Sequence, residues 1–241
     1  MDKVLECPDI VINFDTEDLL KTGASELVAK IRPNWNKNEF NFKIFTDGIS
    51  NKLIGIYTSD KNQMVLVRVY GAKTELIIDR QAEIRNMLVL NKVGCGCQLY
   101  AKFANGLAYE FLPGDILNIE SVKNPEIYPK VAQAMAKMHK NVDLGPQVPK
   151  NPCMWTKLHM FLRQYPDSLQ DSRLESNGIS RDRLEKEVKM LEDKLTSTSS
   201  PVVFTHNDLL LANIVIDGEK VSFIDYEYGD YNYQGRSLST L

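Results

Sequence analysis

The stretch that decides the fold lies near the end of the chain, where residues 205–213 read THNDLLLAN and residues 221–225 read VSFID. Together they spell H-x-D-x4-N, followed by an Asp at the end of an apolar run. Apolar runs flank each polar position and predict short strands, whose ends would place the polar side chains on one side of the fold. The three candidate residues are Asp208, Asn213 and Asp225.

This pattern favours phosphoryl transfer. Moving a γ-phosphoryl group requires an oxygen base near the acceptor hydroxyl and oxygen ligands that hold magnesium against the phosphates. Protein kinases supply these groups in the same order along the chain. We therefore predict Asp208 as the catalytic base, with Asn213 and Asp225 as catalytic magnesium ligands. A polar loop beside an ordinary hairpin would explain H-x-D-x4-N alone, but the apolar flanks favour the catalytic interpretation, with His206 as a packing residue that shapes the loop.

A cation for the phosphates is expected upstream. Arg68 is the sole charge in the apolar run MVLVRVY, residues 64–70, and burying it without an anion would be costly. Glu83, in the helical stretch that follows, is its natural partner, and the pair would correspond to the Lys and Glu that position the phosphates in protein kinases. The alternative is a surface Arg on an edge strand.

A phosphate-binding turn is the second upstream candidate. Residues 46–51 read TDGISN and lie between two predicted strands, where they offer backbone amides and short hydroxyls to phosphate oxygens. A lone Gly is a weak signal, and a plain hairpin turn explains the stretch equally well. The candidate nucleotide-binding residues in this stretch are Asp47, Gly48, Ser50 and Asn51.

The secondary-structure pattern changes along the chain, and this change predicts an α+β protein with two lobes. The β-rich lobe, residues 1–111, is expected to hold strands at 9–13, 40–44, 53–58, 64–70, 98–103 and 107–111 and helices from residue 16 to 31 and from Asp79 to Gly94. Apolar Ile84, Met87 and Leu88 belong to the pattern of that second helix. The helical lobe, residues 112–241, follows the break at Leu-Pro-Gly, residues 112–114, with helices starting at Asn124 and running over 180–195.

Composition narrows the function classes. The 241 residues are 43% apolar and 25% charged, with a net charge of −3 and no basic stripe, so no nucleic-acid partner is expected. We find no secretory signal and no apolar run long enough for a membrane span, which predicts a cytoplasmic protein. The four cysteines lack a CxxC pair and are expected to be reduced thiols. The sequence carries no signal for oligomeric state.

The motifs resemble those of the choline and ethanolamine kinases. The residues that carry the resemblance are the stretch at 205–213, the IDYEY run at 224–228, the YNYQ run at 231–234, the turn at 46–55, residues 70–76 and residues 109–111. The last three are closer to the ethanolamine branch. The resemblance implies a bilobal fold like that of eukaryotic protein kinases, with ATP and Mg²⁺ required and ethanolamine phosphorylated to phosphoethanolamine for phosphatidylethanolamine biosynthesis. It also implies that the backbone of residues 110–112, at Glu110 and Leu112, faces the adenine.

The resemblance has one departure, at the C-terminus. In the family, further helices follow the YNYQ run and line the amino-alcohol pocket, whereas here residues 235–241 read GRSLSTL. We therefore expect an incomplete C-terminal lobe with an alternative ending, and the alternative function is an inactive truncated isoform that lacks a complete acceptor pocket. A kinase-like phosphotransferase for another small hydroxyl compound, such as an aminoglycoside, is a further alternative, which the motif at 226–228 disfavours.

Overall fold

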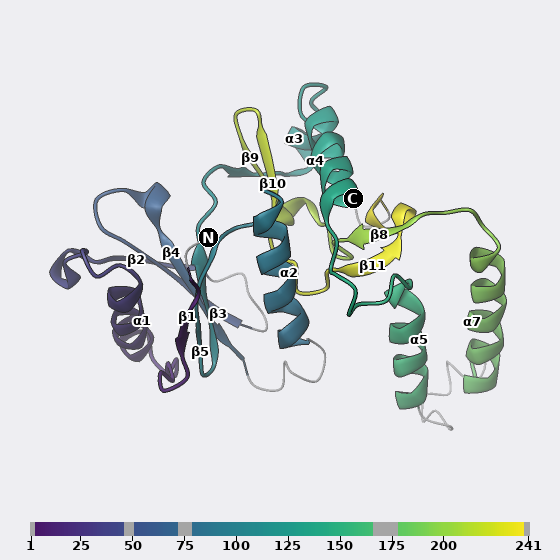
Figure 1. Ribbon diagram of the computed structural model, residues 1–241, viewed down its shortest axis with the longest axis horizontal. Coiled ribbons are helices and arrows are strands. Elements are labelled where there is room, and N and C mark those ends of the chain that lie inside the picture. Colours follow the sequence, from purple (N-terminus) through teal and green to yellow (C-terminus); the bar gives the residue numbers. More distant parts are fainter. Residues whose placement is uncertain (1–2, 46–50, 72–78, 166–177, 239–241) are drawn as a thin grey trace.

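The computed structural model describes residues 3–45, 51–71, 79–165 and 178–238 (Figure 1). Its N-terminal half is built on a sheet that has six strands within these residues, in the order β1-β5-β6-β4-β3-β2. β1 runs parallel to β5, and every other neighbouring pair is antiparallel. The strands are β1 (Leu5–Cys7), β2 (Asn41–Phe45), β3 (Asn51–Tyr57), β4 (Val65–Tyr70), β5 (Leu99–Phe103) and β6 (Gly106–Glu110).

The predicted strands of this half are confirmed except for the first. β2, β3 and β4 form the expected antiparallel meander, and β5 and β6 form the expected hairpin. The strand predicted at 9–13 is wrong, because β1 lies earlier and Pro8 follows it directly. Instead of a strand ladder, the side-chain amide of Asn105 bonds both the N–H and the carbonyl of Ile12. The Ile12 side chain is buried, which explains its strand-like pattern.

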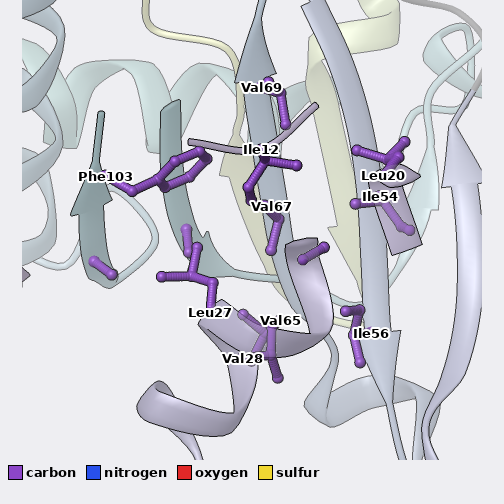
Figure 2. Packing of buried hydrophobic residues seen from close by; sticks show 13 residues of the cluster. Ile12, Leu20, Leu27, Val28, Ile54, Ile56, Val65, Val67, Val69 and Phe103 are labelled. Atoms are coloured by element: carbon purple, nitrogen blue, oxygen red, sulfur yellow. The ribbon is translucent and has the colours of Figure 1, made fainter. Parts of the chain in front are cut away.

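Helix α1 (Glu17–Ile31) covers one face of this sheet. Thr16 caps its first turn through a bond from the Leu19 amide. Leu20, Leu27 and Val28 of α1 point toward the apolar side chains of the strands in Figure 2. Burial of these side chains holds the helix on the sheet.

Helix α2 (Arg80–Lys92) lies between the sheet and the C-terminal half (Figure 1). Its cap, Asp79, accepts bonds from the Gln81 and Ala82 amides. The buried positions are Glu83, Asn86 and Leu90. The apolar pattern indicates the packed face only in part: Ile84 and Met87 are half-buried and pack against the core of the sheet, whereas Leu88 is 41% exposed.

The C-terminal half combines helices with two small sheets. Gly114 joins it to β6, with a φ of 133° and no room for a side chain against the Ile216 carbonyl. Within the described part of the chain, the small sheets have the orders β10-β9-β7 and β11-β8. The elements are β7 (Asp115–Ile116), α3 (Ile119–Val122), α4 (Tyr128–Asn141), α5 (Cys153–Gln164), α7 (Arg181–Thr196), β8 (Val202–Thr205), β9 (Ile214–Asp217), β10 (Lys220–Phe223) and β11 (Asp230–Tyr233).

The helix expected from Asn124 begins later than predicted. α4 starts at Tyr128, and Asn124 instead closes the turn after α3, accepting bonds from Glu126 and Ile127. A side chain that caps a turn and one that caps a helix use the same bond to a nearby amide, so the sequence does not separate them. The helix predicted at 180–195 is confirmed as α7, whereas α5, β7 and β11 were not predicted.

Two further expectations concern membranes and thiols. No helix in the described ranges is long and apolar enough to cross a membrane. The four cysteines, all within the described residues, are free thiols.

Candidate active site

The polar stretch 205–213 forms the loop between β8 and β9. Asn213 Nδ2 donates to the Asp208 carbonyl at 2.8 Å, which closes the loop on itself. The Asn213 carbonyl accepts a bond of 3.0 Å from the Ile224 amide, the residue just before Asp225. The Asn213 side chain thus contacts the backbone of Asp208, and the Asn213 backbone contacts the residue before Asp225.

His206 contacts this loop region from the buried interior. Its side chain is buried, Nε2 lies 2.8 Å from the Ile224 carbonyl, and its ring is tilted against that of Tyr226 with the ring centroids 4.6 Å apart. Burial lowers the pKa of His206, so the neutral ring donates its Nε2 proton to that carbonyl. This arrangement fits the packing role predicted for His206.

Asn207, which sequence reasoning missed, holds the loop in place. Asn207 and Asp225 are the two non-glycine residues with positive φ in the described part of the chain, at 65° and 64°. The Asn207 side chain accepts bonds from Thr205 at 2.8 Å and Asn232 at 2.9 Å. Its Nδ2 donates to the Tyr228 carbonyl at 2.9 Å. The signal in the sequence was the residue type, because Asn tolerates left-handed backbone and bonds backbone groups.

Arg68 connects the two halves of the site. The predicted pair is present, with Arg68 Nη1 3.0 Å from Glu83 Oε1. Arg68 Nη2 also lies 2.9 Å from Asp225 Oδ1, and Glu227 Oε2 is 3.7 Å from Nη1. Arg80 binds the other oxygen of Glu83 at 3.0 Å. The central strand β4 therefore places one cation against three carboxylates.

Glu227 is a second residue that the site prediction did not include. Burial and the neighbouring Asp225 raise the pKa of Glu227 to about 7, although Arg68 opposes the shift. A carboxyl group with such a pKa in a cluster of charges is typical of functional sites. The available signal was its position, two residues after Asp225 in the IDYEY run.

The remaining nucleotide-site candidates have different outcomes. Asp47, Gly48 and Ser50 lie outside the described residues. Asn51 begins β3, and its Oδ1 lies 3.4 Å from Arg80 Nη2, which places it beside the charged cluster. Its role in binding phosphate stays a prediction.

The segment at 110–112 connects the two halves. The Glu110 amide donates to Gln98 and the Phe111 amide to Met64. No hydrogen bond from the Leu112 amide forms within the described residues. That N–H is therefore available to a ligand, and the expected contact of this segment with adenine stays a prediction.

The oxygen donors at the site suit magnesium. Asn213 uses its amide nitrogen within the loop, which leaves its Oδ1 available, and Arg68 binds only one oxygen of Asp225. Hard oxygen ligands in small number, completed by phosphates and water, are what Mg²⁺ prefers. Residues Asn213 and Asp225 therefore fit the ion that was predicted for them.

The architecture defines the class of protein. A β-rich half carries a cation paired to a helix carboxylate, and a second half carries Asp, Asn and Asp at the ends of short strands. This is the fold of protein-kinase-like phosphotransferases. A solved aminoglycoside phosphotransferase with bound ADP shares the fold, with a TM-score of 0.55 over 87% of this chain and 74% of that chain at 14% identity.

The family follows from the sequence matches. The profile described as Choline/ethanolamine kinase matches residues 42–240, and the chain belongs to this family. Rat ethanolamine kinase 2 is 42% identical over 230 residues, covering 94% of this chain and 59% of the relative. A solved Plasmodium vivax ethanolamine kinase matches with a TM-score of 0.77 and 25% identity, over 94% of this chain and 67% of that chain. The chain thus spans about three fifths of the length of the curated relatives it matches.

Proposed function

We propose that this chain carries the catalytic site of an ATP-dependent ethanolamine kinase, which forms phosphoethanolamine for phosphatidylethanolamine synthesis. Proteins named ethanolamine kinase match at 34% to 42% identity, in rat and fruit fly among others. The family match and the charged site support the same reaction class. The division into lobes at residues 111 and 112 and the cytoplasmic location stay predictions.

The observation that carries the proposal is the double contact of Arg68. One guanidinium reaches Glu83 at 3.0 Å and Asp225 at 2.9 Å, although Arg68 and Asp225 are 157 residues apart in the sequence. A planar guanidinium suits such a bridge, because its donors are held in a fixed fork. In the proposed reaction Arg68 orients the phosphates of ATP, and Glu83 orients Arg68.

The other residues take roles that follow from their positions. In the proposed reaction Asp208, which lies half-buried on the loop that Asn213 closes, accepts the proton of the acceptor hydroxyl. Magnesium bound by Asn213 and Asp225 would neutralise charge that develops on the phosphates. The Leu112 amide, which is not used within the described residues, is available to the adenine ring.

The test is an assay of the purified chain with ATP and magnesium, with ethanolamine, choline or no acceptor. We expect phosphoethanolamine, identified by phosphorus NMR, together with acceptor-dependent release of ADP. The matched control is Asp208→Asn, which keeps the size of the side chain but removes the base. A higher kcat/KM with choline than with ethanolamine would favour choline as the substrate. Wild-type chain that neither binds MgATP nor forms product would refute the proposed function.

A further inference from the structure

Asn86 is a fully buried amide in the middle of α2, and none of the roles above uses it. Its relative exposure is 0%, and its Nδ2 donates to the Gly229 carbonyl at 2.6 Å. Arg85 donates to the Asn86 Oδ1 from Nη2 at 3.2 Å. Both ends of the amide are thus bonded, and the bond to Gly229 spans 143 residues of sequence.

This bond closes a ring of contacts around the site. Glu83 lies one helical turn before Asn86 on the same buried face of α2, and it binds Arg68. Arg68 binds Asp225, and Gly229, which Asn86 binds, lies four positions after Asp225 in the chain. The helix therefore contacts both Arg68, the cation proposed to bind the phosphates, and the segment that carries Asp225.

The packing at Gly229 shows that the approach of the two segments is close. A Cβ at residue 229 would lie 2.8 Å from Phe204 Cζ and 3.4 Å from Asn86 Nδ2. The Gly229 amide is itself bonded to the Tyr226 carbonyl at 2.9 Å. The segment from 225 to 229 therefore has little freedom to move as long as Asn86 holds its end.

The C-terminal end of α2 is held by the C-terminal half as well. Leu90 belongs to the same buried cluster as Phe204 and Tyr226. The Tyr226 hydroxyl donates to the Cys95 carbonyl at 2.9 Å, just past the end of the helix. The apolar contacts hold the helix against this half, and the Asn86 amide adds a directional bond that fixes the register between them.

We infer that Asn86 is a positioning residue, whose bond to Gly229 sets the place of Asp225 relative to Arg68. The inference rests on the proposed function for its kinetic consequence, but not for the coupling between the two segments. In this inference α2 holds the two halves of the site in a fixed position relative to each other. Loss of the bond should misplace the magnesium and phosphate groups while leaving the acceptor side of the site intact.

The experiment compares Asn86→Ala with Val131→Ala, a substitution in α4 that removes buried apolar volume from the same cluster as Leu90 but leaves the Asn86–Gly229 bond in place. For Asn86→Ala we expect the KM for MgATP to rise about tenfold and kcat to fall, with the KM for ethanolamine changed by less than about twofold. Val131→Ala should lower the melting temperature but change the KM for MgATP by less than about twofold. An equal rise in that KM in the control would overturn the inference.

Hydrogen exchange tests the coupling without requiring activity. In Asn86→Ala, exchange should increase both in α2, residues 80–92, and in residues 225–230, because each segment loses its contact with the other. An increase confined to α2, or the same increase in Val131→Ala, would overturn the inference. If Asn86→Ala does not fold, the shape-matched Asn86→Asp, which lacks the donor, carries the same two measurements.

The two proposals can fail separately. Wild-type chain without MgATP binding or phosphate transfer refutes the proposed function, while the exchange result still decides whether Asn86 couples the segments. Normal wild-type activity with unchanged kinetics and exchange in Asn86→Ala refutes the positioning role alone.

Discussion

Replacing Asp225 by Asn separates the catalytic from the structural contribution of this side chain. Asn is the appropriate substitution because residue 225 has a φ of 64°, a conformation that Asn accepts and Ala does not accept easily. The change keeps the volume of the side chain and removes its charge. It therefore weakens both the contact with Arg68 and the proposed contact with magnesium.

The structural cost should be small. The Asp225 side chain is 36% exposed, so solvent screens its pair with Arg68, and such pairs contribute about 0–1 kcal/mol. Arg68 also keeps its bond to the buried Glu83. For a protein of this size, a loss of about 1 kcal/mol lowers the melting temperature by about 2–4 °C.

The catalytic cost should be much larger. A ligand that holds magnesium against the phosphates contributes several kcal/mol to stabilising the transition state. A loss of about 4 kcal/mol corresponds to roughly a thousandfold decrease in kcat/KM, since each 1.36 kcal/mol is tenfold. The expected signature of Asp225→Asn is therefore a folded protein with almost no turnover.

The measurement combines thermal melting, calorimetry with MgATP and a coupled assay of ADP release. The control is Asp217→Asn, the same chemical change at an exposed position at the end of β9, which should retain wild-type activity. Turnover above about a tenth of wild type in Asp225→Asn would refute the role of Asp225 as a metal ligand. A melting temperature lowered far more than expected would instead indicate a structural role.

Three further predictions address other parts of the site. Asp208→Asn should lower kcat while the KM for ATP stays nearly unchanged, as steady-state kinetics would show, because a base for the acceptor hydroxyl does not hold the nucleotide; a raised KM with normal kcat would contradict the role. Asn207→Gly should keep the backbone conformation but lose the side-chain bonds with Thr205, Asn232 and the Tyr228 carbonyl, lowering stability by about 1–3 kcal/mol in urea unfolding, and an unchanged midpoint would show that these bonds are not important. Burial raises the pKa of the half-buried Cys97 to about 12 and also raises that of the buried Cys153, so at pH 8 iodoacetamide should label both far more slowly in the folded than in the urea-unfolded chain by mass spectrometry, and equal rates would argue against the raised pKa values.

Local signals predicted much of the fold. Thr16 and Asp79 mark the starts of α1 and α2, because a cap bonds amides two or three residues away and so needs no distant partner. The alternating apolar residues of β2, β3 and β4 likewise predicted a meander. Asn124 misled the prediction because a turn and a helix use the same local bond.

The candidate site was predictable in part. The H-x-D-x4-N spacing identified Asp208 and Asn213, and the lone charge in an apolar strand identified Arg68, whose pairing with Glu83 the structure confirms. The raised pKa of Glu227 was not predictable, since it depends on burial beside Asp225 in the folded chain.

The sequence by itself thus predicted most of the strands, several of the helices and the chemical groups available for phosphoryl transfer, because each depends on residues close together along the chain. Only the tertiary structure decided which groups meet. Arg68 reaches Asp225 across 157 residues, and Asn86 reaches Gly229 across 143. The residue type of Asn86 does not reveal whether its side chain is exposed or buried. That is decided by which face of α2 packs against the rest of the fold.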